Sequence, residues 1–216
     1  GVVRFGGRST NWQWRILGGS RQDDGLLNLK DHYRNNFLDL RSELQLNESD
    51  ELSLLMGINK SKSEIGFARS VIDRERSEKT DSSFGLLRWR RTLSPDHEIS
   101  ITASRTRDGG EDRFEIPITS DALVIDYGRE AVRDSLEYQH FLGLSDKWRA
   151  SWGAEYRRYS VQAPQLFNTD QVQRANSLRA YTNLEWRPLN DWTFNLGGLI
   201  ERDSVAGTQF APRLVA

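Results

Sequence analysis

Apolar residues recur at every second position in many short segments of the chain. Leu38, Leu40 and Leu44 alternate with charged and polar residues, and residues 52–58 continue the alternation after the polar stretch 47–50. A period of two predicts β-strands with one apolar and one polar face. Two such strands joined by a short polar turn predict an antiparallel hairpin.

The same unit returns along the whole chain, which predicts ten strands and the start of an eleventh at 209–216. We find no amphipathic helix of useful length. Short turns are expected at 8–11, 47–50, 93–97, 143–147 and 188–191. The connections that alternate with them are expected to be long, at 22–34, 61–81, 108–130 and 161–174, except for the last, 204–207, which is short. Tight turns at one rim and long loops at the other are typical of outer-membrane barrels.

Tryptophans support this interpretation because they gather near the short turns. The five that do so on the apolar face are Trp12, Trp89, Trp148, Trp186 and Trp192. An indole is amphipathic and sits well at the level of lipid headgroups, so the pattern predicts an interfacial girdle. The alternative is a set of core tryptophans in a soluble β-sandwich.

The predicted polar face carries many charges. We assign Leu40, Leu54, Trp152, Leu184 and Phe194 to the apolar face. The residues expected on the polar face are Arg15, Arg21, Asp39, Arg41, Glu43, Arg88, Arg90, Arg133, Glu137, Arg149, Glu155, Arg157, Arg179, Glu185 and Glu201. Such side chains need water or each other, for example as ladders of Arg and carboxylate. Alternatively they form the solvated face of a soluble sheet, which would need a second layer over its apolar face.

Composition narrows the choice of protein class. The chain has 216 residues, a formal net charge of −1, no Cys, and 25 Arg against five Lys. It has no apolar run of about 18 residues, so no transmembrane helix is expected. The low mean hydropathy of −0.68 is compatible with a membrane barrel, in which only every second residue faces lipid. The charge balance gives no reason to expect nucleic acid as a partner.

No catalytic constellation is found, so we expect neither an enzyme nor a bound cofactor or metal. His32, His97 and His140 are scattered in the sequence. The acidic stretch 108–112 lacks the alternating oxygen ligands of a calcium loop and is expected to be a solvated loop. The paired glycines precede no helix and so make no dinucleotide fingerprint.

Several segments resemble one family. Residues 210–216 resemble the "(F/S)-x-P-R-x-(A/S)" start of a mid-barrel strand in TonB-dependent outer-membrane receptors, and 191–202 resemble the strand before it. Residues 88–95 resemble a strand-to-periplasm turn of that family, and 3–7 the end of its first barrel strand.

The resemblance implies an all-β fold: an antiparallel up-and-down transmembrane β-barrel of about 22 strands, plugged by an N-terminal globular domain, in the bacterial outer membrane. Such receptors import ferric siderophores or similar metal chelates and take energy from the TonB complex. Residues 1–216 are then expected to be a partial barrel domain of 10–11 strands that lacks the plug and the C-terminal half. Alone, such an open sheet is expected to need detergent or its missing half.

The long loops are the expected recognition surface. Arg and aromatic side chains suit anionic chelates through charged hydrogen bonds and cation–π contacts. The ligand-binding candidates are Tyr33, Arg34, Arg69, Arg74, Arg76, Phe167 and Arg174. The alternative for any loop is a surface that faces outer-membrane lipid and lipopolysaccharide only. Two other functions stay open: a smaller pore or adhesin barrel without a plug, and a soluble β-sandwich binding protein.

Overall fold

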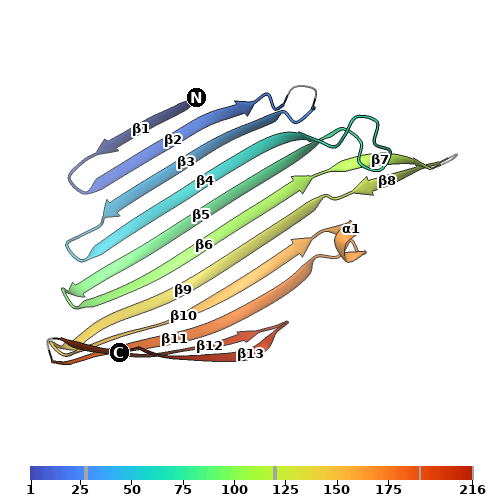
Figure 1. The fold of residues 1–216 in the computed structure, drawn as a ribbon. Coiled ribbons are helices and arrows are strands. Elements are labelled where there is room, and N and C mark those ends of the chain that lie inside the picture. The colour runs from blue at the N-terminus through green and yellow to red at the C-terminus, as the bar shows by residue number, and fades with distance from the viewer. Residues whose placement is uncertain (27–28, 119–120, 190, 216) are drawn as a thin grey trace.

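The computed structural model describes residues 1–26, 29–118, 121–189 and 191–215, which form one large antiparallel sheet of eleven strands (Figure 1). Its strands are β1 (Val2–Arg8), β2 (Trp12–Asp23), β3 (Tyr33–Gln45), β4 (Asp50–Ile65), β5 (Arg76–Ser94), β6 (His97–Glu111), β9 (Arg129–Ser145), β10 (Trp148–Gln162), β11 (Gln173–Leu189), β12 (Trp192–Asp203) and β13 (Gly207–Val215). A separate hairpin of β7 (Arg113–Ile118) and β8 (Asp121–Asp126) projects from the sheet, and α1 (Pro164–Phe167) follows β10.

Each strand of the sheet pairs with its sequence neighbour, except that β6 pairs with β9 across the projecting hairpin. The predicted all-β meander is therefore confirmed, and so is the expected number of strands in the sheet. The β7–β8 hairpin, which lies within the expected long connection 108–130, was not predicted. The sheet is open, as a partial barrel would be: the outer edges of β1 and β13 pair with no other strand of the described chain.

The predicted strand limits were wrong at the rim of the long connections. β4 runs to Ile65 and β5 begins at Arg76, so the expected connection 61–81 shrinks to 66–75. The stretch 108–112, expected to be a solvated loop, is mostly the end of β6. In these segments both faces are polar, so the hydrophobic period disappears although the backbone ladder continues. In the predicted turn 188–191, residue 190 lies outside the described residues, as does residue 216 of the predicted last strand.

Strand register fixes the two faces of the sheet. Leu40 lies opposite Ile16 and Met56, whereas Arg41 lies opposite Arg15 and Leu55. Residues directly opposite in a ladder share a face, and following the pairs across the sheet confirms all ten facing assignments of the alternation. We call these two surfaces the apolar face and the polar face. All fifteen charged residues expected on the polar face lie there.

The apolar face has no protein layer over it. Ala163 is the one buried hydrophobic residue among those described, while Leu136 and Leu196 are 55% and 58% exposed. The accessible surface of 15469 Å² is well above the roughly 10,000 Å² expected of a compact monomer of this mass. A β-sandwich would bury this face under a second sheet, and the described residues form no such sheet. No helix of the described chain is long and apolar enough to cross a membrane.

Aromatic residues gather on the apolar face at the short-turn rim, on the left of Figure 1. The rings of Trp148 and Trp186 stack with centroids 5.4 Å apart, and Trp186 lies 5.5 Å from Phe194. Trp192 stacks on Phe194 at 5.8 Å. The predicted grouping of tryptophans at this rim is therefore present, and its indoles are partly exposed.

Candidate functional site: the polar face and the long-connection rim

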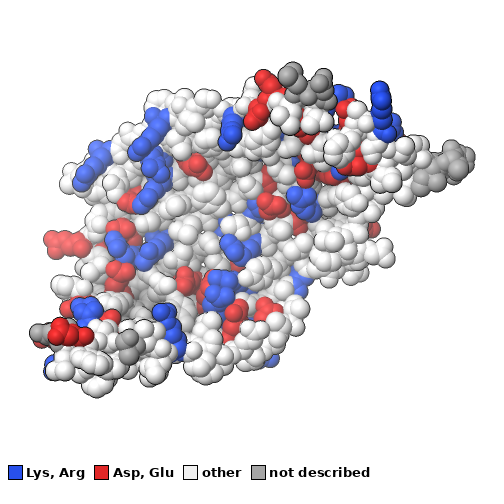
Figure 2. All heavy atoms as spheres, viewed as in Figure 1, with Lys and Arg blue, Asp and Glu red and all other residues white. Residues whose placement is uncertain are grey.

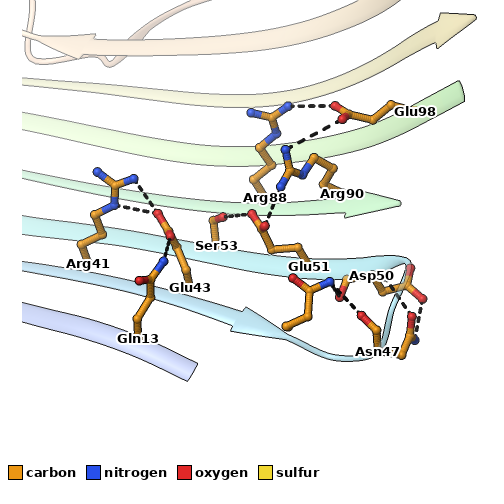
Figure 3. A network of polar contacts seen from close by, with 11 residues as sticks. Gln13, Arg41, Glu43, Asn47, Asp50, Glu51, Ser53, Arg88, Arg90 and Glu98 are labelled. Atoms are coloured by element: carbon orange, nitrogen blue, oxygen red, sulfur yellow. Dashed lines mark hydrogen bonds and ion pairs between the residues drawn. The ribbon is translucent and has the colours of Figure 1, made fainter. Parts of the chain in front are cut away.

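Ion pairs and hydrogen bonds link side chains of the polar face, both within one strand and between neighbouring strands. Arg41 binds Glu43 at 2.5 Å, and the same carboxylate accepts a hydrogen bond from Gln13. Further along, Arg90 joins Glu51 at 2.5 Å (Figure 3). Figure 2 shows the result over one face of the sheet, where cationic and anionic groups lie side by side.

A second network lies on the polar face of β9 to β12. Glu155 is 7% exposed and contacts Arg157 at 2.5 Å and Arg179 at 3.6 Å. Arg179 reaches Glu201 at 3.4 Å on the next strand. The Tyr181 hydroxyl donates to Glu137 at 2.8 Å. Ladders of this kind satisfy charges that alternate with an apolar face, as the sequence predicted.

The polar face is also hollowed. A cavity of about 730 Å³ lies over β1 to β3, and its lining includes Arg4, Arg8, Arg15 and Arg41 with the single acid Glu43. Sequence reasoning named Arg15 and Arg41 singly and missed this grouping. The signal was available, because Arg4 and Arg8 fall on the polar face of the first strand. Such a surface is suited to anionic groups.

Arg76 is held at the long-connection rim by its own neighbours. Its Nε and Nη2 donate to Asp112 at 2.5 and 3.0 Å, and its Nη1 donates to Asp73 at 2.5 Å. The guanidinium lies 4.1 Å from the ring centroid of Phe114. The hydrogen bonds to Asp112 contribute most to raising the pKa of Arg76 above its usual value. Arg76 therefore joins β5 to the β7–β8 hairpin, an arrangement that we call the Arg76 clasp. Its guanidinium is not available to bind a ligand.

Arg69 and Arg74 differ from Arg76 in being exposed. Both line a cavity of about 390 Å³ with Phe67 and with Pro117 of the hairpin. Arg69 has a left-handed φ of 72°, which turns the connection sharply. These two cations are therefore free to meet a ligand.

Tyr33 and Arg34 open β3 and do not lie in a loop as expected. Both line a cavity of about 330 Å³, but neighbouring residues of a strand point to opposite faces. Tyr33 is on the polar face, opposite Asp23 and Ser63. Arg34 is on the apolar-face side, where Gln22 accepts two hydrogen bonds of 3.0 Å from it once the amide is oriented to satisfy both groups.

Phe167 and Arg174 flank the connection between β10 and β11. Phe167 ends α1 and is 43% exposed. Arg174 is also a strand residue, opposite Ser160 on the apolar-face side of the sheet. The seven candidates thus share one rim but no single cavity, and Arg34, Arg76 and Arg174 do not present free cations to the polar face.

Two histidines that looked unrelated in the sequence are neighbours in space. The Nε2 atoms of His97 and His140 are 2.8 Å apart and their rings stack at 4.9 Å. Trp152 packs edge-on against His140 at 5.0 Å. The sequence spacing of 43 residues hid this pair, which forms because β6 and β9 are adjacent. The described residues contain no group of three or more potential metal ligands.

No family model and no curated protein matches the chain. Several solved structures, however, match nearly the whole chain. The siderophore receptor PirA from Acinetobacter baumannii matches 99% of this chain with a TM-score of 0.79 and 11% identity. A mutant of the ferric enterobactin receptor PfeA from Pseudomonas aeruginosa matches 99% with 0.78 and 11%. This chain has the fold of part of a TonB-dependent receptor barrel.

The resemblance in fold extends beyond siderophore receptors. The RagAB peptide importer matches 97% of this chain with a TM-score of 0.72 and 9% identity. The chain covers 37%, 38% and 32% of these three structures, in the order given, so it spans a little over a third of their length. Identities this low establish the architecture, and the cargo must be argued from the residues.

Proposed function

We propose that the chain is part of the barrel wall of an outer-membrane transport receptor that binds and imports a ferric siderophore or a similar metal chelate. The observation that carries this proposal is the single-layer meander with one uncovered apolar face and one hollowed, charged face. Lipid suits the first face and a water-filled or plugged interior suits the second. The role is transport, and no enzymatic activity is part of the proposal.

In this proposal residues 1–216 are a partial barrel domain, about half of a 22-stranded wall. A plug and the remaining strands belong to parts of the receptor outside this segment. The TonB complex, which supplies the energy, acts through the plug.

The cargo is argued from the free cations of the long-connection rim. Arg69 and Arg74 lie exposed at one cavity, which the exposed ring of Phe67 also lines. Tyr33 lines a second cavity. Lys30 and Glu75, 2.9 Å apart, connect the two cavity-forming segments. An Arg fork with an aromatic neighbour suits an anionic chelate, whereas a neutral peptide would leave these charges without a partner.

Cysteine labelling tests the membrane topology, because the chain has no Cys of its own. Single variants of the full-length protein, Ala68→Cys in connection 66–75 and Asn47→Cys in a short turn, are exposed to a membrane-impermeant maleimide on intact cells. We expect labelling of the first variant only, with the second labelled after the cells are opened. Labelling of both on intact cells would refute the barrel topology.

An uptake assay tests the transport activity separately. Iron-starved cells that lack the gene encoding this chain should lose energy-dependent uptake of at least one radiolabelled ferric chelate, and the full-length gene should restore it. Uptake that persists after the proton gradient is collapsed would indicate a passive pore. Unchanged uptake of every ferric chelate, with correct topology, would refute the proposed cargo.

A further inference from the structure

The apolar face changes character where β3 and β4 approach the long-connection rim. Beyond Leu38 and Ile58, the next residues on this face are Asn36 with Lys60, and then Arg34 with Lys62. All four of these polar side chains are exposed. A surface that is aliphatic along most of its length therefore ends in a cationic patch, which we define as Arg34, Lys60 and Lys62.

Strand register brings like charges together in this patch. Arg34 lies directly opposite Lys62, which in turn lies directly opposite Lys79 of β5. Like charges at directly opposed positions destabilise a sheet. Lys79 has an acid at 3.4 Å, in Glu111, but within the described chain Arg34, Lys60 and Lys62 form no ion pair within 4.0 Å.

Two neighbouring cations on the same side of the sheet, Arg105 and Arg107, have acidic partners. Arg107 contacts both Asp81 and Glu130, the latter at 3.1 Å. Asp81 lies opposite Lys60, but its carboxylate is engaged by Arg107. Arg105 lies 3.6 Å from Asp134. Arg158, Arg174 and Arg202 on this side also form no ion pair in the described chain, but none of them lies directly opposite another cation. The grouping of unpaired cations at opposed and alternate positions is therefore particular to the patch, and it indicates that an external anion balances the charge.

The distance from the apolar band suggests which anion. Lys60 and Lys62 lie two and four residues beyond Ile58 on β4. At about 3.3 Å per residue and a strand tilt near 45°, they stand about 5 and 9 Å above the edge of that band. Headgroups occupy roughly the first 5–8 Å outside the hydrocarbon core, and long cationic side chains adjust their reach by snorkelling.

We propose that Arg34, Lys60 and Lys62 bind the phosphate groups of an outer-leaflet glycolipid, the phosphorylated diglucosamine headgroup of lipopolysaccharide. This inference rests on the proposed membrane location. The Arg34 fork can take two phosphate oxygens, and the two ammonium groups act as point charges beside it. Arg34, expected from the sequence to bind a chelate, is thereby assigned to lipid.

The test compares two triple variants of the full-length protein with equal loss of charge. The first is Arg34→Gln, Lys60→Gln and Lys62→Gln. The matched control is Arg21→Gln, Arg133→Gln and Arg213→Gln, three polar-face arginines without an ion pair in the described chain. Each protein is reconstituted into nanodiscs that contain diphosphorylated or dephosphorylated lipid A, and retained lipid is measured after detergent washing.

We expect the wild type and the control to retain the diphosphorylated lipid at least tenfold better than the patch variant, and the dephosphorylated lipid poorly in all three. Excess inorganic phosphate should compete only weakly, because it lacks acyl chains that remain in the bilayer. Equal retention by the two variants would overturn the proposal. So would retention that is independent of the lipid phosphates, or complete displacement by inorganic phosphate.

The cysteine-labelling result separates this inference from the function proposed above. If labelling shows the expected topology while the two triple variants retain lipid equally, the lipid site is refuted and the receptor topology stands. If labelling contradicts the barrel, both fail. A loss of chelate uptake with intact lipid retention, or the reverse, likewise assigns the failure to one proposal.

Discussion

The two rims of the sheet are built by different means. At the short-turn rim, backbone bonds close the connections: Ser9 donates to the carbonyl of Trp12 at 2.7 Å, and Leu46 to that of Asp50 at 2.8 Å. At the long-connection rim, side chains bind the projecting segments, as Arg76 binds Asp73 and Asp112. A short turn is positioned by the backbone hydrogen bonds of the strands that it joins. A segment that projects beyond the strands needs ion pairs between side chains to hold it in place.

Breaking the Arg76 clasp is the strongest way to test this comparison. Because Arg76→Ala leaves the nearly buried Asp112 without its cation, we expect the β7–β8 hairpin to lose about 3 kcal/mol of local stability, typical of a broken buried ion pair. Hydrogen exchange should show lost protection in 113–126. Arg74→Ala is the control, since Arg74 is exposed. Equal effects of the two substitutions would contradict the assignment of Arg76 as the clasp.

The exposed arginines should show the opposite behaviour. Arg69→Ala and Arg74→Ala should leave the hydrogen exchange of the hairpin unchanged but weaken chelate binding to the full-length receptor. Loss of one charged hydrogen bond corresponds to about 1.5–3 kcal/mol, roughly tenfold to a hundredfold in Kd. The measurement is a fluorescence titration with an anionic ferric chelate. Unchanged affinity in both variants would mean that this part of the rim does not carry recognition.

The aromatic cluster tests the short-turn rim with a smaller expected effect. Trp186 stacks on Trp148 and packs against Phe194 with a tilted ring, so Trp186→Leu should keep most of the buried area but lose about 1 kcal/mol of aromatic pairing. The readout is the unfolding midpoint in lipid vesicles. Brominated lipids should quench tryptophans of this rim in the wild type, and an absence of quenching would argue against its contact with lipid.

The narrowest effect concerns Asp50, at the rim before the first apolar residue of β4, because in the wild type it changes stability only at acidic pH. Hydrogen bonds from Arg91, and then from Asn47 and Trp89, lower the pKa of Asp50 to about 2. A depressed carboxyl pKa adds stability above the unfolded value near 4, and that stability is lost as pH falls toward 2. Wild-type stability should therefore drop between about pH 4 and 2, and Asp50→Asn should flatten that part of the curve. An unchanged curve would refute the role of Asp50.

Much of this architecture could be predicted from the sequence because side chains alternate between the two faces of a strand. The period of the apolar residues therefore determines which face each residue occupies. Leu40 and Arg41 had to face opposite ways once one face was apolar. The prediction failed where the period vanished, as in 59–65, since a backbone ladder persists without any hydrophobic signal.

The candidate site was less predictable because it depends on partners distant in sequence. Arg69 and Arg76 are both arginines of one polar segment, and nothing local distinguishes the free cation from the clasped one. Asp112, 36 residues from Arg76, makes the difference. Likewise, the sequence alone placed Arg34 in a loop. Only the structure shows that β3 begins at Tyr33 and that Arg34 lies on the apolar-face side.

The β7–β8 hairpin interrupts the chain between two strands that nevertheless pair directly, β6 with β9. The wall is therefore modular: each strand depends on its two neighbours alone, and a segment can be added at the rim without shifting any ladder. During evolution the connections can therefore change while the pairing of the strands is preserved. New binding segments can be acquired, exchanged or discarded at a connection such as 112–128 while the wall keeps its register.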